Sequence, residues 1–116
     1  MTEHCCNLKE HEACVEKASE IMPTFDEIDV MASRFKVLSE QSRLKILFAL
    51  CAGEMCVEHI TKAVSGNQSA VSHQLKTLKD NKIIKCKRAG KQMIYSLADE
   101  HILKIIELAK EHLHCE

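Results

Sequence analysis

The chain has 116 residues and a formal net charge of −1, a size that supports one domain with a modest hydrophobic core. Aromatic residues make up only 3%, and one proline and three glycines favour helices over a turn-rich β fold. No apolar run approaches the roughly 20 residues that span a bilayer, and the N-terminus lacks the basic and apolar stretches of a secretory signal. We therefore expect a cytoplasmic protein without a membrane partner, whose seven cysteines are reduced thiols available to metal ions.

The near-neutral total hides a segregated charge. Residues 1–30 carry eight acidic and two basic side chains, and residues 92–116 carry five acidic and two basic ones. Residues 67–91 contain seven Lys or Arg and one Asp, a local net charge of +6. A basic segment in an otherwise acidic chain is the electrostatic pattern of a protein that binds phosphate groups.

Apolar residues at helical spacing predict a series of helices through the first two thirds of the chain. They cover, in chain order, residues 10–22, residues 25–38 after an N-cap at Thr24, a helix opened by Ser39 and ended by Gly53, residues 57–64, and residues 69–81. The last two are joined by a turn that contains Ser65-Gly66. Two short helices with a glycine-containing turn between them form a helix-turn-helix pattern.

The last third predicts a β-hairpin followed by a helix. Strand-like runs at residues 83–87 and 92–97 flank the basic turn Arg88-Ala89-Gly90-Lys91, and the final helix begins near Asp99 and carries a long apolar stripe. The fold class predicted is therefore mainly α with a small β-hairpin wing, a winged helix-turn-helix. We divide the chain into an N-terminal arm, residues 1–22, and a DNA-binding and dimerisation domain, residues 23–116.

The second helix of the helix-turn-helix and the basic hairpin predict a surface that binds double-stranded DNA. Short polar side chains approach base edges in the major groove, and cations neutralise phosphates without reading the sequence. The candidate base-reading residues are Gln68, Ser69, Ser72, His73 and Lys76, and the candidate phosphate contacts are Lys79, Lys87, Arg88 and Lys91. The alternative interpretation is a solvated polar helix beside an ordinary charged hairpin.

Several motifs resemble those of one protein family. The run AVSHQLKTLKDNKIIKCKRAGKQMIYSLADEHI, preceded by SEQSRLKILFAL and by the cysteine in GEMCVEHI, is similar to the ArsR/SmtB family of metal-sensing repressors. Within the family it most resembles the zinc, cadmium and lead sensors of the SmtB and CadC types, over roughly residues 28–115. The resemblance implies a homodimeric repressor that binds operator DNA as apoprotein. Metal then lowers its DNA affinity and derepresses metal efflux or resistance genes.

Four residues at the two ends of the final helix are candidate metal ligands: Asp99, His101, His112 and Cys115. His101 and His112 are 11 positions apart, so they share a helix face but lie about 16 Å apart along its axis. One ion with bonds of about 2 Å cannot join them within one helix. Two antiparallel copies of the helix would instead form two equivalent four-ligand sites related by a dimer twofold axis.

The family resemblance supports this C-terminal site. Zinc sensors of the family carry Asp-x-His near the start of the helix and His-x-x-Glu or His-x-x-His near its end. Asp99, His101 and His112 match, whereas Cys115 departs from the pattern and has His114 and Glu116 beside it as substitutes. A frayed polar terminus is the alternative.

The remaining thiols predict a second metal site. CadC-type sensors carry Cys-x-Cys in the segment around Cys56 and two more cysteines on an N-terminal arm; here Glu58 replaces the second cysteine of the motif. The resemblance implies a thiolate-rich site for Zn²⁺, Cd²⁺ or Pb²⁺ built from Cys5, Cys6, Cys14 and Cys56. In the alternative, the arm thiols only scavenge metal and Cys56 is a remnant.

Other functional classes stay open. A thiol-based redox or arsenical sensor on the same fold would use the same cysteines, whereas a metal-storage protein that never binds DNA is disfavoured by the +6 segment. The sequence has no Gly-rich phosphate loop, His-Glu-x-x-His motif or nucleophile elbow. We therefore expect neither enzymatic activity nor a small-molecule substrate.

Overall fold

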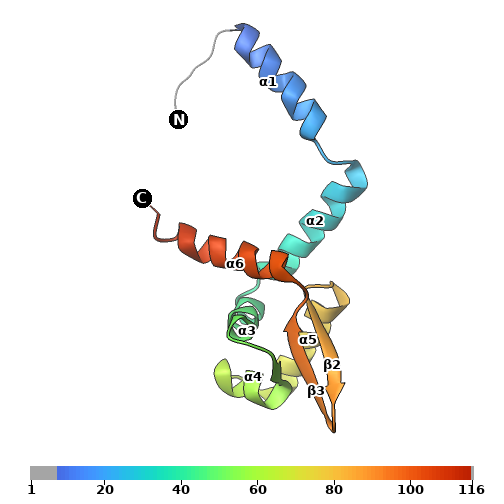
Figure 1. Cartoon of the computed structure of the whole chain (residues 1–116), viewed down its shortest axis with the longest axis vertical. Coiled ribbons are helices and arrows are strands. Elements are labelled where there is room, and N and C mark those ends of the chain that lie inside the picture. The colour runs from blue at the N-terminus through green and yellow to red at the C-terminus, as the bar shows by residue number, and fades with distance from the viewer. Residues whose placement is uncertain (1–7, 116) are drawn as a thin grey trace. The chain divides into compact units, whose positions relative to one another are not determined.

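The computed structural model describes residues 8–115, and the chain divides into two compact units, residues 1–32 and 33–116 (Figure 1). The first unit contains α1 (Leu8–Ile21) and most of α2 (Phe25–Leu38), whereas the second contains the rest. The division proposed above, into an arm of residues 1–22 and a domain of residues 23–116, concerns roles and stays a prediction. No helix in the described part of the chain is long and apolar enough to cross a membrane.

The start of α2 is fixed by a reciprocal cap. The Glu27 backbone N–H donates to the Thr24 hydroxyl at 3.1 Å, and the Thr24 N–H donates to the Glu27 carboxylate at 2.8 Å. This capping box satisfies two backbone donors that the helix leaves free, and it confirms Thr24 as the N-cap.

The next helix, α3 (Gln41–Cys51), begins later than the sequence predicts. Its N-cap is Glu40, whose carboxylate accepts from the Arg43 N–H at 3.1 Å. The prediction that Ser39 opens this helix is wrong, because the Ser39 hydroxyl donates to the Lys36 carbonyl and so completes the end of α2. Hydrogen bonds from the Ser42 side chain and from the Arg43 N–H lower the pKa of Glu40, as expected for a capping carboxylate.

The helix-turn-helix consists of α4 (Val57–Ala63) and α5 (Gln68–Asp80), close to the predicted bounds. Asn67 caps α5 by accepting from the Ala70 N–H at 3.1 Å. In the turn, a Cβ atom on Gly66 would lie 3.2 Å from methyl groups of Val64 and Val71. The turn is therefore packed closely against both helices.

Three strands form one antiparallel sheet in the order β1-β3-β2. The predicted hairpin is β2 (Ile84–Ala89) and β3 (Gln92–Leu97), which we call the wing; Gly90 opens its two-residue loop with φ 65°. The sequence did not predict β1 (Met55–Cys56), whose two residues pair with Tyr95 and Ile94.

One apolar core holds the second unit together. It takes side chains from every helix from α2 to α6 (Glu100–His112) and from the residues that lead into the wing: Leu38, Ile46, Leu47, Leu50, Ile60, Val71, Leu75, Leu78, Ile83, Ile84 and Ile106. Burial of this apolar surface is the main force that holds α5 and the wing in place.

Candidate DNA-binding surface and metal ligands

The helix α5 has a buried edge and an exposed polar face. Val71, Leu75 and Leu78 recur at i, i+4 and i+7 and are buried, so the opposite face points to solvent. All nine predicted DNA-binding residues are exposed: Gln68, Ser69, Ser72, His73, Lys76, Lys79, Lys87, Arg88 and Lys91. Helix and wing thus present hydroxyl, amide, imidazole and cationic groups within one unit, as recognition of a DNA groove and its phosphates requires.

A polar link that sequence patterns did not predict orients α5. The Arg43 guanidinium on α3 donates from Nε to the Gln74 side-chain oxygen at 2.8 Å, and from Nη1 to the Val37 carbonyl at 3.3 Å. Both bonds are part-buried, and Gln74 lies 31 positions from Arg43 in the sequence, so periodicity could not have identified this link. Arg43 therefore connects the end of α2 to the face of α5 beside the candidate base-reading residues.

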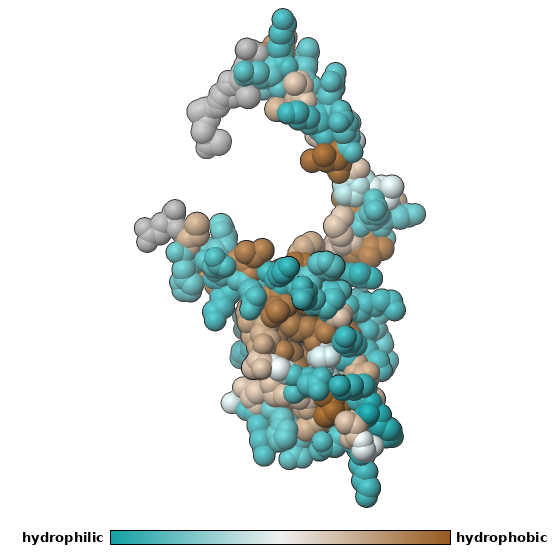
Figure 2. All heavy atoms as spheres, in the orientation of Figure 1, coloured by the Kyte–Doolittle hydropathy of each residue, from teal (hydrophilic) through white to brown (hydrophobic). Residues whose placement is uncertain are grey.

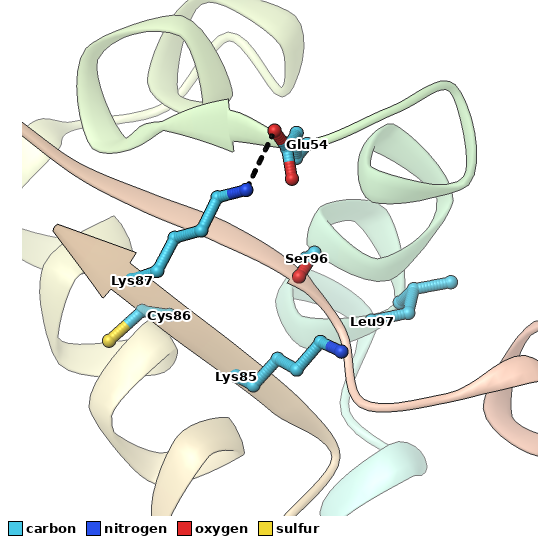
Figure 3. Close-up of a pocket in the computed structure, with 6 residues that line it drawn as sticks. All are labelled: Glu54, Lys85, Cys86, Lys87, Ser96 and Leu97. Atoms are coloured by element: carbon cyan, nitrogen blue, oxygen red, sulfur yellow. Dashed lines mark ion pairs between the residues drawn. The ribbon is translucent and has the colours of Figure 1, made fainter. Parts of the chain in front are cut away.

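Several of the cationic candidates have partners within the chain. Lys76 lies 3.0 Å from the Asp80 carboxylate, and Lys87 reaches across the sheet to Glu54 at 3.4 Å (Figure 3). A hydrogen bond with Cys86 is the main cause that raises the pKa of Lys79. The two ion pairs are exposed, and such pairs contribute little to stability. Phosphates can therefore replace the carboxylates at modest cost.

Successive side chains of β2 alternate between the two faces of the sheet, which separates its lysines from Cys86. Lys85 and Lys87 extend from one side of the strand toward the hollow that Glu54 borders, whereas Cys86 points to the other side (Figure 3). The cations of β2 and the thiol between them thus lie on opposite faces of the sheet.

The first pair of predicted C-terminal ligands lies at the start of α6. Asp99 is the N-cap: its Oδ1 accepts from the Ile102 N–H at 3.2 Å and the His101 N–H at 2.9 Å. The hydrogen bond from the Ile102 N–H is the largest cause that lowers the pKa of Asp99, and the bond from the His101 N–H adds to it. The carboxylate therefore stays ionised to lower pH. The His101 ring, whose side chain is 86% exposed, has Nδ1 3.6 Å from the same oxygen.

The second pair lies at the other end of α6. His112 is the last helical residue, and Cys115 follows in a turn in which its N–H donates to the His112 carbonyl at 3.1 Å. Both side chains are exposed. The structure brings Asp99 beside His101 and keeps Cys115 close to His112 in the chain, but the 13-residue helix separates the two pairs. Within residues 8–115 no three His, Cys, Asp or Glu side chains gather as a metal site requires.

The four cysteines of the predicted thiolate site lie in different parts of the chain. Cys5 and Cys6 lie outside the described residues, and Cys14 is exposed on α1. Cys56 is buried, 5% exposed, at the junction of β1 and α4, and its Sγ lies 3.4 Å from Nδ1 of His59. Sequence reasoning did not single out His59, which is exposed. Its i, i+3 spacing from Cys56 was the available signal, because residues one helical turn apart share a face.

Among the described residues, nothing covers an apolar surface along α6. Ile105, Leu108 and Leu113 are exposed, and apolar atoms reach the surface along this helix (Figure 2). Beside it, α3 and α6 enclose a groove of about 690 Å³ that Phe48 and Cys51 help to line. Burial there is the main cause that raises the pKa of Cys51, and a raised pKa disfavours the thiolate form that reacts and binds metal.

Comparison with known proteins finds relatives over most of the chain. The family model described as "Bacterial regulatory protein, arsR family" matches residues 40–85. A cadmium resistance transcriptional regulatory protein CadC homolog from Staphylococcus aureus is 35% identical over 97% of this chain and 93% of its own. A transcriptional repressor SmtB homolog from Synechocystis sp. is 34% identical over 85% of this chain and 77% of its own.

A solved structure agrees with the fold. The homodimeric winged helix-turn-helix DNA-binding domain of a possible ArsR-family regulator from Mycobacterium bovis superposes with a TM-score of 0.72 at 29% identity. The match covers 83% of this chain and 95% of that one. The winged helix-turn-helix predicted from the sequence is confirmed.

Proposed function

Because the chain belongs to the ArsR family of bacterial regulatory proteins, we propose that it is a metal-responsive transcriptional repressor whose dimer binds operator DNA through α5 and the wing. The observation that carries this function is the exposed polar face of α5 beside a cationic wing. One relative is named a transcriptional repressor, and another a cadmium resistance transcriptional regulatory protein. The phosphate contacts are Lys79, Lys87, Arg88 and Lys91. The base-reading residues are Gln68, Ser69, Ser72, His73 and Lys76.

In this proposal the dimer forms through α6. Its exposed apolar residues supply surface to bury, and antiparallel pairing sets Asp99 and His101 of one chain against the partner subunit's His112 and Cys115. The donor set of carboxylate, imidazole and thiolate suits a tetrahedral Zn²⁺ or Cd²⁺. The separation of the two ligand pairs along α6 supports this arrangement, because only a second chain can complete either pair.

The connection from this site to the DNA-binding unit is short. The Ala98 N–H donates to the Ile83 carbonyl at 3.0 Å, so the Asp99 end of α6 adjoins the loop that follows α5. A histidine that ligates metal through one ring nitrogen donates its other N–H to a nearby acceptor. We infer that the partner subunit's His112 donates to a carbonyl near Lys82 and thereby shifts α5 and the wing away from the spacing that the operator requires.

A second metal site uses thiolates. Cys56 combines with arm cysteines from Cys5, Cys6 and Cys14 to bind Zn²⁺, Cd²⁺ or Pb²⁺, since thiolates prefer such soft or borderline ions. The CadC homolog, which is named for cadmium resistance, supports a thiolate site in this chain.

The test is operator affinity at fixed salt. Reduced apoprotein first selects its operator from a random DNA pool, and Zn²⁺, Cd²⁺ and Pb²⁺ are then titrated into the complex. We expect metal to release the DNA, and the coupling free energy is the difference between metal affinities of the free and DNA-bound dimer. The same titration with Cys56→Ser and with the double variant His101→Ala/His112→Ala identifies the regulatory site as the one whose loss leaves the complex intact.

Two controls separate the alternatives. Lys104→Ala changes an exposed side chain of α6 that forms an ion pair with Glu100 at 3.8 Å, and it should leave the response to metal unchanged. DNA binding that ignores every metal, but is lost on addition of an oxidant, would replace the metal sensor with a thiol-based redox sensor.

A further inference from the structure

The contact between Cys56 and His59 suggests a metal-binding pair. The Cys56 Sγ lies 3.4 Å from the His59 Nδ1. Cys56 ends β1 and immediately precedes α4, so the first turn of that helix carries the His59 ring back over the thiol. The two donor atoms therefore face each other within one chain and without help from the arm.

The separation of the two atoms matches a coordination edge. Bonds of about 2.3 Å to sulfur and about 2.0 Å to nitrogen, meeting at a tetrahedral angle, place the donors about 3.5 Å apart. We propose that Cys56 and His59 together bind the metal ion at the thiolate site, with His59 Nδ1 in the role that a second cysteine has in CadC-type sensors. This inference rests on the thiolate site of the proposed function and specifies its ligands.

Glu58, which stands where those sensors carry the second cysteine, is engaged elsewhere. Its carboxylate lies 3.9 Å from Lys62 one turn along α4, and both side chains are mostly exposed. His59, not Glu58, therefore contacts Cys56. The departure of this sequence from the Cys-x-Cys motif moves the second ligand by one position and exchanges its sulfur for nitrogen.

A tetrahedral metal ion needs two ligands in addition to Cys56 and His59. Within residues 8–115 no third His, Cys, Asp or Glu joins a group of this kind. The remaining donors are therefore thiols of the N-terminal arm or groups of a second chain. Metal binding transfers the Cys56 thiol proton to solvent, and a mixed imidazole and thiolate set favours Zn²⁺ over ions that select thiolate alone.

The pair also has a direct structural route to the wing. Cys56 pairs with Ile94 of β3, and the neighbouring Met55 pairs with Tyr95. Glu54, the residue before β1, forms the ion pair with Lys87 on β2. A metal ion that displaces Cys56 therefore acts on both strands of the wing. It acts on β3 through the backbone pairing of β1, and on β2 through the ion pair of Glu54 with Lys87.

The test isolates this site in the full-length reduced protein that carries His101→Ala/His112→Ala. Co²⁺ serves as the probe, because its sulfur charge-transfer and d–d absorption bands report ligand type and geometry, and Zn²⁺ competition gives the affinity. We expect His59→Ala to weaken metal binding about tenfold or more and to shift the d–d bands. Cys56→Ser should also reduce the sulfur charge-transfer band, whereas Glu58→Ala should change neither measurement.

Each outcome bears on the proposal. Because His59 is exposed, its variants are expected to fold; His59→Gln, which keeps a polar side chain, and operator binding by the apoproteins check this. Loss of affinity with Glu58→Ala but not with His59→Ala would overturn the pair and restore the family position. If even Cys56→Ser leaves metal binding intact, the thiolate site itself fails, and metal release of DNA by the unmodified protein then shows whether the repressor function still holds.

Discussion

Two amphipathic helices of equal length, α5 and α6, differ in what the single chain buries. α5 places three apolar side chains in the core and exposes a polar face, whereas α6 buries only Ile106 and leaves Ile105, Leu108 and Leu113 exposed. The polar face of α5 suits nucleic acid, and the apolar face of α6 suits another apolar surface. The core thus buries the apolar edge of α5, whereas α6 keeps an exposed apolar face among the described residues.

The largest expected effect is on the buried edge of α5. Leu78 is fully buried, so Leu78→Ala removes core contacts and leaves a cavity. We expect the free energy of unfolding to fall by about 2–5 kcal/mol, measured by urea denaturation. Ser72→Ala on the exposed face of the same helix is the matched control and should change stability little, although it should weaken operator binding.

A leucine-to-alanine change on α6 should weaken dimerisation and leave the fold of the single chain intact. Leu108 is 62% exposed in the single chain, and Leu108→Ala should leave the core intact. If each copy loses about 1.5 kcal/mol of burial at a twofold interface, the dimer dissociation constant rises about 100-fold. Sedimentation equilibrium measures this change, with Lys104→Ala as the control. An unchanged dissociation constant would show that α6 is not the dimer interface.

A smaller effect is expected where α5 is held in orientation. Arg43→Met removes the hydrogen bonds to Gln74 and to the Val37 carbonyl, and leaves part-buried acceptors unpaired. We expect a loss of about 1–2 kcal/mol in the free energy of unfolding, with weaker operator binding. A double-mutant cycle with Gln74→Leu measures the coupling. Additive losses would mean that Arg43 acts on α5 through other contacts.

The comparison also explains how much of the fold the sequence could predict. The helices and the wing were predicted close to their bounds, because their apolar periodicity extends over many residues. The strand β1 was missed, since two residues cannot show alternation and the strand exists only because β3 offers it an edge. The start of α3 was misplaced because Ser39 and Glu40 are both able to cap, and only the tertiary arrangement decides which of them does.

The candidate sites were less predictable than the fold. Residue types and spacing predicted candidate ligands on α6, and their separation along the helix led to the prediction of a second chain, which no observation tests. The same reasoning overlooked His59, whose relation to Cys56 depends on where α4 begins. It also did not predict that Lys76 and Lys87 have carboxylate partners, Asp80 and Glu54. A sequence shows which residues share a face of one helix, but contacts between helices and strands depend on how these elements pack.

The smallest expected effect separates two roles of Asp99, which caps α6 and is also a proposed metal ligand. Asparagine caps as well as aspartate does, so Asp99→Asn should keep α6 folded and still weaken metal binding, whereas Asp99→Ala should impair both. Thermal unfolding of the metal-free protein and Zn²⁺ titration measure the two effects. Equal metal affinity in the unmodified protein and in Asp99→Asn would remove Asp99 from the ligand set.

The pH dependence of the same variant tests the cap. Because backbone hydrogen bonds lower the pKa of Asp99 in the folded state, its carboxylate stabilises the protein above its unfolded pKa of about 3.9. That contribution is lost as the pH falls through the folded pKa. The unmodified protein should therefore melt slightly above Asp99→Asn at neutral pH, and the difference should vanish in acid. A difference that persists in acid would mean that the carboxylate charge of Asp99 is not what stabilises the start of α6.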